Sequence, residues 1–144
     1  MSTQIFVNLA TDDLERSKAF YTALGGTINP DFTDDNAACI VWSEQNYFMV
    51  LRRDYFATFT EKTVADARTT AQAIVALSRE SRDDVNATVE AGLAAGGSEP
   101  REAQDYGFMF SRTLEDPDGN ILEFLYMDPA AAESGPEAWE AQQG

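Results

Sequence analysis

The sequence predicts an α+β fold in which two βαβββ modules form a curled mixed β-sheet cup with helices on its outer face. Three observations support this prediction. A β-prone run is followed by an amphipathic stretch twice along the chain, each amphipathic stretch ends at a double glycine, and two β-prone runs around a short polar turn come after each. The glycine pairs lie 97 − 26 = 71 residues apart in a chain of 144, so the repeat covers about half of the chain.

The first module is predicted at residues 1–53. It begins with a strand at residues 5–9, Ile-Phe-Val-Asn-Leu. The helix that follows opens at a capping box of Asp12 and Glu15 and stops at Gly25-Gly26. A short strand is expected at residues 27–32. A hairpin then pairs residues 37–43 with residues 47–53 around the turn Glu44-Gln45-Asn46.

The second module is predicted at residues 73–128, with a strand at 73–78. Ser81 and Asp84 cap its helix, which stops at Gly96-Gly97. A short strand is expected at 99–102, and a hairpin pairs 107–115 with 121–127. Its turn is Asp116-Pro117-Asp118-Gly119-Asn120, in which both aspartates are expected to bond their own backbone.

Two segments lie outside this repeat. Residues 54–72 have no clean period and form a connector with some helix, which is expected to fold over an open sheet. Residues 129–144 are rich in Ala, Glu, Gly and Gln and are expected to form a mobile acidic tail, with Trp139 as its one anchor. The two modules are expected to form one domain.

Composition excludes several function classes. The chain has 25 acidic and 10 basic residues, a formal charge of −15, and no histidine. Such a charge opposes nucleic acid and anionic membranes, because both bind through Lys and Arg. Without histidine, Ser-His-Asp catalysis and imidazole-based metal sites are impossible, so carboxylates would have to move any proton.

The cysteine count and the apolar runs bear on location. Cys39 is the single cysteine, so the chain cannot form an intramolecular disulfide, and its apolar neighbours predict a buried thiol. No apolar run approaches the roughly 20 residues that a membrane helix needs, and the amino terminus lacks a signal pattern. A cytoplasmic location is the expectation.

Two motifs carry a resemblance to a known family. The segments Asp13-Leu14-Glu15-Arg16-Ser17 with Phe20-Tyr21 and Leu24-Gly25, and Glu115-Asp116-Pro117-Asp118-Gly119-Asn120 with Glu123, resemble the vicinal oxygen chelate superfamily. This group includes glyoxalase I, bleomycin-resistance proteins, extradiol dioxygenases and PhnB-like proteins. The resemblance covers residues 4–128. It implies the glyoxalase/bleomycin-resistance fold, a ligand site inside the cup and a homodimer.

The resemblance also implies where a metal would be bound. Metal-dependent members use four side chains, one on the first and one on the last strand of each module. Motif and internal symmetry map these positions to Phe6, Met49, Ile74 and Glu123. A hard divalent cation needs several oxygen or nitrogen donors, and only Glu123 supplies one. We therefore expect no metal and no other cofactor.

The candidate ligand-binding residues either share the cup face of a strand or could supply an aromatic wall. They are Phe6, Asn8, Trp42, Met49, Leu51, Ile74, Phe108, Phe110 and Glu123. Glu123 lies among apolar neighbours, so it must be paired, reach water or a ligand, or stay protonated with a raised pKa. It either faces a bound molecule as acceptor or base, or pairs with Arg53, Arg112 or Asn8.

Three functions follow as hypotheses. The first is a metal-free protein that binds a small, partly apolar molecule in the cup, for which an aromatic cation is well suited. The second is a metal-dependent lyase, isomerase or dioxygenase related to glyoxalase I, with Glu123 as the catalytic base. It needs replacement donors from Gln4, Asn8 or the acids of residues 54–61. The third is a structural or regulatory homodimer without a ligand.

Overall fold

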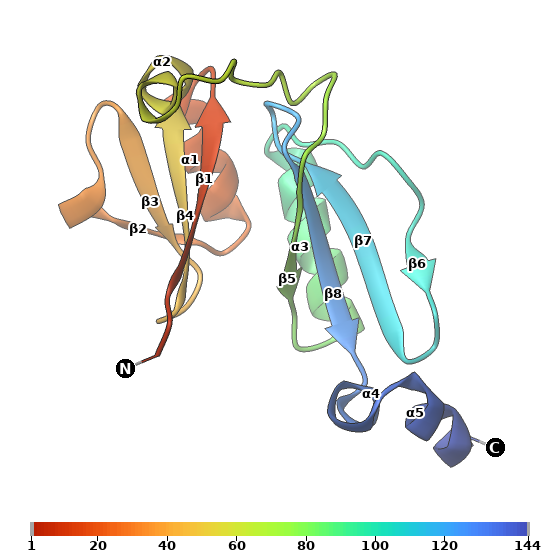
Figure 1. Cartoon of the computed structure of the whole chain (residues 1–144). Coiled ribbons are helices and arrows are strands. Elements are labelled where there is room, and N and C mark those ends of the chain that lie inside the picture. Colours follow the sequence, from red (N-terminus) through yellow and green to blue (C-terminus); the bar gives the residue numbers. More distant parts are fainter. Residues whose placement is uncertain (1, 144) are drawn as a thin grey trace.

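The computed structural model describes residues 2–143 and has two four-stranded mixed sheets, each with helices on one face (Figure 1). The first sheet has the order β1-β4-β3-β2 and the second the order β5-β8-β7-β6. In each, the first strand runs parallel to the last and the other neighbours are antiparallel. The α+β fold of two βαβββ modules is therefore confirmed, and the sheets curl without closing.

The strands of the two modules correspond one to one. They are β1 (Ile5–Thr11), β2 (Thr27–Asn29), β3 (Ala37–Val41) and β4 (Asn46–Arg52), followed by β5 (Ile74–Ser78), β6 (Gln104–Asp105), β7 (Met109–Glu115) and β8 (Ile121–Met127). The two predicted hairpins are β3–β4 and β7–β8, with turns where the sequence places them.

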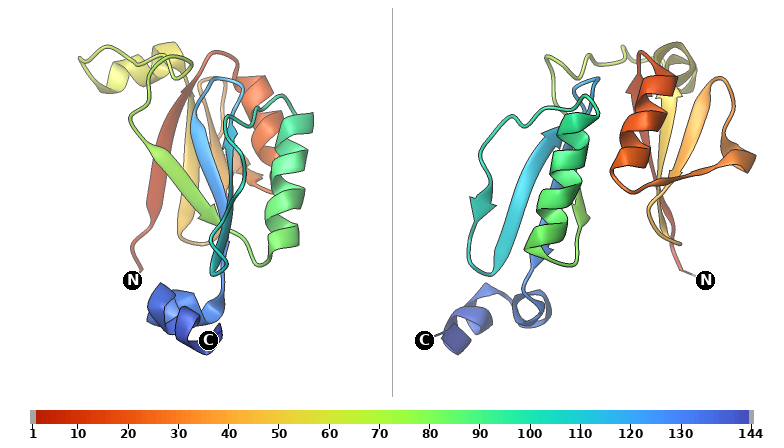
Figure 2. Two further views of the ribbon diagram at one scale, coloured as in Figure 1. Left: turned by 90° about the vertical axis from the view of Figure 1, so that its right-hand side faces the viewer. Right: turned by 180° about the vertical axis from the view of Figure 1, so that it is seen from behind.

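Helices α1 (Leu14–Ala23) and α3 (Arg82–Ala94) cover the same side of the two sheets and contact each other (Figure 2). Ser81 caps α3 as predicted, because its hydroxyl accepts the N–H of Asp84. The capping box predicted on Asp12 is wrong by one residue. The carboxylate of Asp13 accepts the N–H of Arg16 instead, because β1 extends to Thr11 and the Asp12 carboxylate is bound elsewhere.

One hydrophobic core fills the space between helices and sheets, and both modules contribute to it. Its largest fully buried side chains include Phe20, Tyr21, Phe48 and Phe124. Burying an aliphatic or aromatic side chain of this kind stabilises a fold by about 1.5–3 kcal/mol. Gly92 of α3 allows the close approach to the first module, since a Cβ there would meet Leu24 and Leu114.

The short outer strands differ from prediction. The strand expected at residues 99–102 lies at β6 instead, and Ser98 makes only an isolated bridge to Glu115. Pro100 has no N–H to donate to a ladder, which interrupts pairing there. In the first module, Pro30 begins a 3-10 turn (Pro30–Phe32) that shortens β2.

The connector and the tail contain helix. The connector holds α2 (Arg53–Phe56) and a 3-10 turn (Ala57–Phe59), then crosses between the modules at one end of the sheets (Figure 1). The tail forms α4 (Pro129–Ser134) and α5 (Pro136–Gln143). Its expected anchor, Trp139, packs against Phe108 with the ring centroids 6.2 Å apart. In residues 2–143, no helix has the length and apolar character to cross a membrane.

Candidate functional site

Successive side chains of each strand point to opposite faces of its sheet, one that faces the helices and one that is open. In β4, Phe48 and Val50 are buried against the core, whereas Met49 between them points to the open side and is half-buried. The register places Asn8 of β1 beside Met49 and Met49 beside Cys39 of β3. The structure therefore agrees with the prediction of which side chains of β1 and β4 face the open side.

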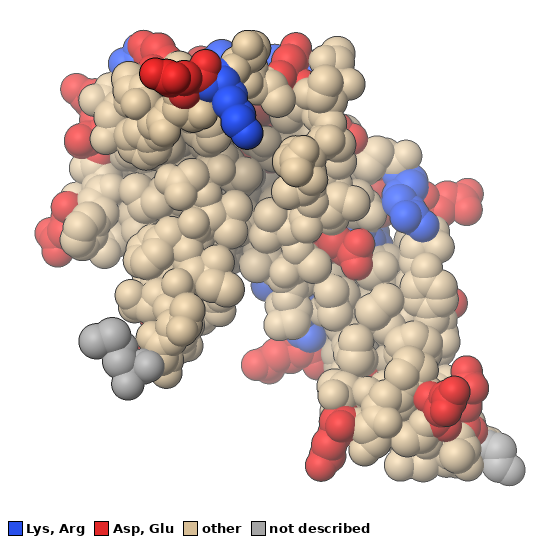
Figure 3. Space-filling model, in the orientation of Figure 1, with Lys and Arg blue, Asp and Glu red and all other residues tan. Residues whose placement is uncertain are grey.

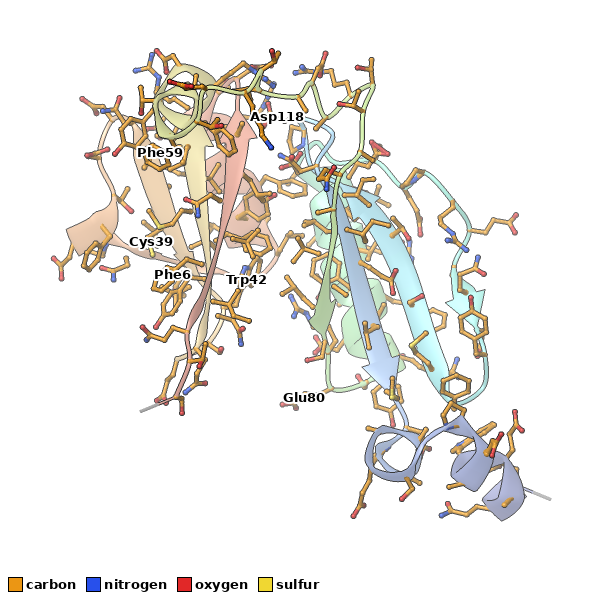
Figure 4. The ribbon with its side chains drawn as sticks, viewed as in Figure 1. Phe6, Cys39, Trp42, Phe59, Glu80 and Asp118 are labelled. Carbon is orange, nitrogen blue, oxygen red and sulfur yellow. The ribbon has the colours of Figure 1, made fainter. Side chains whose placement is uncertain are left out.

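A cavity of about 370 Å³ lies on the open side of the first sheet. Three of the predicted ligand-binding residues, Asn8, Met49 and Leu51, form its strand-borne wall. Ala37 at the start of β3 also lines it, and the remaining lining comes from the loop after β2 and from the connector: Asp31, Phe32, Thr33, Asp34, Tyr55 and Phe59. We call this space the cup cavity. In Figure 4 Phe59 lies over the upper end of this sheet, above Cys39 and Phe6.

The charge on the cup cavity comes from two aspartates, since its lining contains no lysine or arginine. Asp34 is held in place by accepting the N–H groups of Asn36 and Ala37, while Asp31 is exposed. Figure 3 shows that the surrounding open face is largely uncharged, with acidic and some basic groups at its margins. A positively charged group inside this cavity would meet the negative charge of its lining.

Aromatic rings at the mouth of the cup cavity were missed by the sequence analysis. The rings of Tyr55 and Phe59 pack edge to face, with centroids 5.1 Å apart. Phe32 and Phe59 are 66% and 59% exposed, so their faces are available to a ligand. The available signal was the presence of aromatic residues in a connector expected to fold over an open sheet.

Trp42 does not supply a wall of the cup. It lies on the helix-facing side, with its ring 6.2 Å from that of Tyr21 and 5.3 Å from that of Phe48. The guanidinium of Arg79, from the second module, lies 5.8 Å from its centroid. Trp42 shares the phase of Ile40, which belongs to the core, and this places it away from the open side.

Phe110 and Phe108 also lie away from the cup. Phe110 shares the helix-facing phase of Leu114 in β7, and the Arg82 guanidinium of α3 lies 5.1 Å from its ring. Phe108 precedes β7 and packs between Tyr106 and the tail. These residues therefore do not line the cup cavity, and its aromatic side chains come from the connector and the loop after β2.

Glu123 is partly exposed on the open side of the second sheet, beside Ala76 of β5. Neither expected arginine reaches it, because Arg53 binds Asp12 and Arg112 binds Glu99 and Glu90. Within residues 2–143 its carboxylate has no hydrogen-bond or ion-pair partner, so it faces solvent on the open side. Asn8, the third expected partner, donates its amide to the carbonyl of Phe6.

The four implied ligand positions do not fit a divalent metal ion. Phe6 stacks on Tyr47 at a centroid distance of 4.7 Å, and Ile74 is 60% exposed. A ring, an aliphatic chain and the Met49 thioether offer no hard donor to join Glu123. Across the described residues, no group of three His, Cys, Asp or Glu side chains is placed to hold an ion.

Cys39 is buried as predicted. Burial raises the pKa of its thiol. A thiol in this environment stays protonated at neutral pH and is a weak nucleophile. Cys39 therefore contributes packing beneath the cup cavity.

A cluster of polar side chains joins the two modules at the β7–β8 turn. Asp118, only 1% exposed, accepts bonds from the Thr11 hydroxyl (2.6 Å), the Asp12 N–H (2.9 Å) and the Arg16 guanidinium (2.8 Å). The expectation that Asp118 bonds its own backbone is therefore wrong. All three donors belong to the first module, and the cluster lies near the end of the seam between the modules (Figure 4).

Asp116 combines the predicted turn role with a contact across the modules. Its carboxylate accepts the N–H groups of Asp118 and Asn120, and also the hydroxyl of Tyr21 at 2.7 Å. Burial raises the pKa of Asp116, and burial together with Asp116 raises the pKa of Tyr21 well above its usual value. We call the contacts of Asp116 and Asp118 the module clamp.

Comparison with known proteins supports the family assignment. Residues 3–43 match a family model described as bleomycin resistance protein-like N-terminal. No curated protein shows a significant match to the chain. The N-terminal match agrees with the resemblance to the vicinal oxygen chelate superfamily, and the solved structures described next share the fold.

Solved structures share the fold over most of the chain. A hypothetical protein, SA1046, from S. aureus is 24% identical, with a TM-score of 0.75 over 88% of this chain and 95% of that one. A glyoxalase-related enzyme from Fulvimarina pelagi is 21% identical, with a TM-score of 0.75 over 90% and 91%. A glyoxalase/bleomycin resistance protein/dioxygenase family enzyme from Burkholderia phytofirmans PsJN is 15% identical, with a TM-score of 0.72 over 88% and 99%.

Proposed function

We propose that the protein binds a small, partly apolar, positively charged organic molecule in the cup cavity without using a metal ion. The observation that carries this proposal is the composition of the cavity: aromatic and aliphatic walls around two aspartates, in about 370 Å³. Ligand pockets usually combine an apolar lining with a few polar groups that orient the ligand.

The mouth of the cavity favours a cation with a flat apolar part. Tyr55, Phe59 and Phe32 present ring faces, which attract positive charge with about 0.5–2 kcal/mol for each good contact. Asp31 and Asp34 add attraction that weakens with salt. Met49 at the cavity wall is a flexible apolar side chain that adapts to different shapes.

The alternative of a metal-dependent lyase, isomerase or dioxygenase is less well supported by the residues present. It needs hard donors at Phe6, Met49 and Ile74, which these side chains do not supply. It also needs Glu123 beside the substrate, yet the cup cavity is lined by the first sheet, the loop after β2 and the connector. Metal analysis of the purified protein tests this point directly: we expect less than about a tenth of an ion per chain.

We further propose that the protein forms a homodimer through its open faces. Phe6 and Ile74 are 50% and 60% exposed, and they lie on edge strands of the two sheets. Apolar side chains exposed together commonly mark a protein interface. Sedimentation equilibrium should give twice the chain mass, and Phe6→Glu should shift the species toward monomer.

Calorimetry with ethidium as a cationic probe, and with uncharged phenanthridine as its neutral counterpart, tests the ligand class. Asp31→Asn should weaken ethidium binding about three- to tenfold at low salt and leave phenanthridine unchanged. Asp35→Asn is the matched control, since Asp35 is exposed nearby and does not line the cavity.

The apolar contribution is tested by Phe59→Ala, with Tyr106→Ala as an exposed aromatic control outside the cavity. Phe59→Ala should weaken both probes, and Tyr106→Ala neither. The proposal fails if ethidium does not bind, or if Asp31→Asn and Asp35→Asn have equal effects.

A further inference from the structure

A second cavity, of about 270 Å³, lies at the seam between the two modules. The facing edge strands β1 and β5 contribute Val7, Leu9 and Val75, and β8 contributes Ile121. Since β1 and β5 belong to separate sheets, no backbone ladder closes the seam. The connector crosses it at one end (Figure 1) and supplies about half of the lining, from Phe56 and residues 64–73. We call this space the seam cavity.

The lining of the seam cavity contains no Asp, Glu, Lys or Arg. It consists of aliphatic side chains, several alanines and one phenylalanine, with amides at Asn8, Gln72 and Asn120 and a hydroxyl at Thr70. The amide nitrogen of Asn120 already donates to Ala10 and Asp116. The Asn8 amide donates to the carbonyl of Phe6, so among the described residues of the lining Gln72 remains as the amide that can pair with a polar group on a ligand.

Size and polarity together define what the seam cavity can hold. An apolar cavity of about 150 Å³ stays dry and binds benzene, so 270 Å³ accommodates a molecule of one or two rings. A charged group placed among these side chains would lose its hydration without gaining a partner. The ligand chemistry of this cavity is therefore the opposite of that of the cup cavity.

Ion pairs hold the roof of the seam cavity, and the carboxylate of Asp12 makes two of them. Asp12 accepts the Arg53 guanidinium at 2.8 Å and the Arg68 guanidinium at 2.9 Å, and Arg53 also donates to the carbonyl of Ala65. The arginines flank the roof segment, and their hydrogen bonds lower the pKa of Asp12. All three side chains are partly exposed, and surface ion pairs of this kind are individually weak, so the roof can open.

We propose that the seam cavity is a separate binding site for an uncharged molecule of one or two rings bearing at most one hydroxyl or carbonyl group, and that residues 53–73 are its lid. The site differs from the cup cavity, because its lining is uncharged and Asn8 is the one lining residue that the two share.

Calorimetry with 2-naphthol at neutral pH tests this site on the intact chain, and one molecule should bind per chain. Ala73→Phe places a ring in the lining and should weaken binding at least about tenfold. Ala76→Phe, in β5 three residues further along the chain and outside the lining, should leave it unchanged. Ethidium binding should be the same in Ala73→Phe as in the unaltered protein, which separates this site from the cup cavity.

Amide chemical shifts of the unaltered protein give a readout that does not depend on a variant folding. On addition of 2-naphthol, the largest changes should fall at Ala65, Ala67 and Val75, away from β3. Asp12→Asn should speed association at least about threefold by loosening the lid. Absence of binding, shifts confined to the cup cavity, or equal losses in Ala73→Phe and Ala76→Phe would each overturn the proposal.

Discussion

The module clamp makes a quantitative prediction about stability, because Asp118→Asn should destabilise the fold by about 3 kcal/mol. The substitution removes the charge that pairs with Arg16, a charge-assisted bond worth about 1.5–3 kcal/mol. It also turns one carboxylate oxygen into an NH2 group, so either the Asp12 N–H or the Thr11 hydroxyl loses its acceptor. A buried donor without an acceptor costs a further 1–3 kcal/mol or so. Since Arg16 is 38% exposed and stays partly solvated, we take the lower part of the combined range.

Urea unfolding followed by circular dichroism measures this loss. With an m-value of about 1–3 kcal/mol/M, the midpoint should fall by roughly 1–3 M while the slope stays the same. Asp35→Asn, at an exposed loop position, should change stability by no more than about 0.5 kcal/mol. A double-mutant cycle of Asp118→Asn with Thr11→Val should show non-additivity, since the two side chains bond each other at 2.6 Å. A loss below about 1 kcal/mol, or one equal to that of Asp35→Asn, would refute the inference that this carboxylate joins the modules.

Two further predictions concern the end of the second module near the tail. The Arg82 guanidinium and the Gly107 N–H lower the pKa of Asp105 from 3.8 to about 2, so the stabilising interaction is complete above pH 3.8 and is lost as the pH falls through about 2. An NMR titration of the Asp105 carboxyl should have its midpoint near 2, and Arg82→Met should move it toward 3.8. Gly107→Ala should release the tail, because φ is +79° and a Cβ would lie 2.7 Å from the Trp139 ring. Gly135→Ala, at φ +90° with no neighbour within 4 Å, introduces backbone strain without a steric clash. Hydrogen exchange in α5 should therefore accelerate more in Gly107→Ala than in Gly135→Ala, and equal rates would contradict the docking of Trp139 on Gly107.

Local signals explain why most elements could be predicted from the sequence. Ser81 caps α3 through a bond to a residue three positions along, and Pro117 with Gly119 favours a reversal within five residues. In β1, the order apolar, polar, apolar from Val7 to Leu9 fixes which side faces the core. Each of these features depends on neighbours in sequence, so a single chain is enough to find it.

The predictions that the structure contradicts concern side chains whose orientation or contacts depend on packing between distant segments. The segment that becomes β3 is apolar at every position, so its alternation does not reveal that Trp42 faces α1. Phe110 packs toward the core on the side of Leu114, where it meets Arg82 of α3, a residue 28 positions earlier in the chain. Asp118 resembles an ordinary turn residue until the first module is docked against it, 107 residues away in sequence.

Contacts between distant segments also explain the role of the two sequence motifs that carry the family resemblance. The segment that contains Arg16, Ser17 and Tyr21 and the turn that contains Asp116 and Asp118 bind each other in the module clamp. A carboxylate buried by docking needs donors from the other module, so these residues are required for the fold with or without a ligand. In this chain, the two motifs that carry the resemblance to the superfamily thus join the modules.

Under the proposed function, the chemistry of the ligand depends on segments that the motifs do not include. The cup cavity takes its aromatic and acidic groups from the loop after β2 and from the connector, and the seam cavity takes its uncharged roof from the connector alone. Loops on a rigid scaffold can change without disturbing the core, because their side chains contribute little to it. Exchanging residues 53–73 should therefore alter ligand preference at both cavities while leaving the module clamp intact. If such an exchange unfolds the protein, then in this chain the residues that stabilise the fold cannot be separated from the loops that line the two cavities.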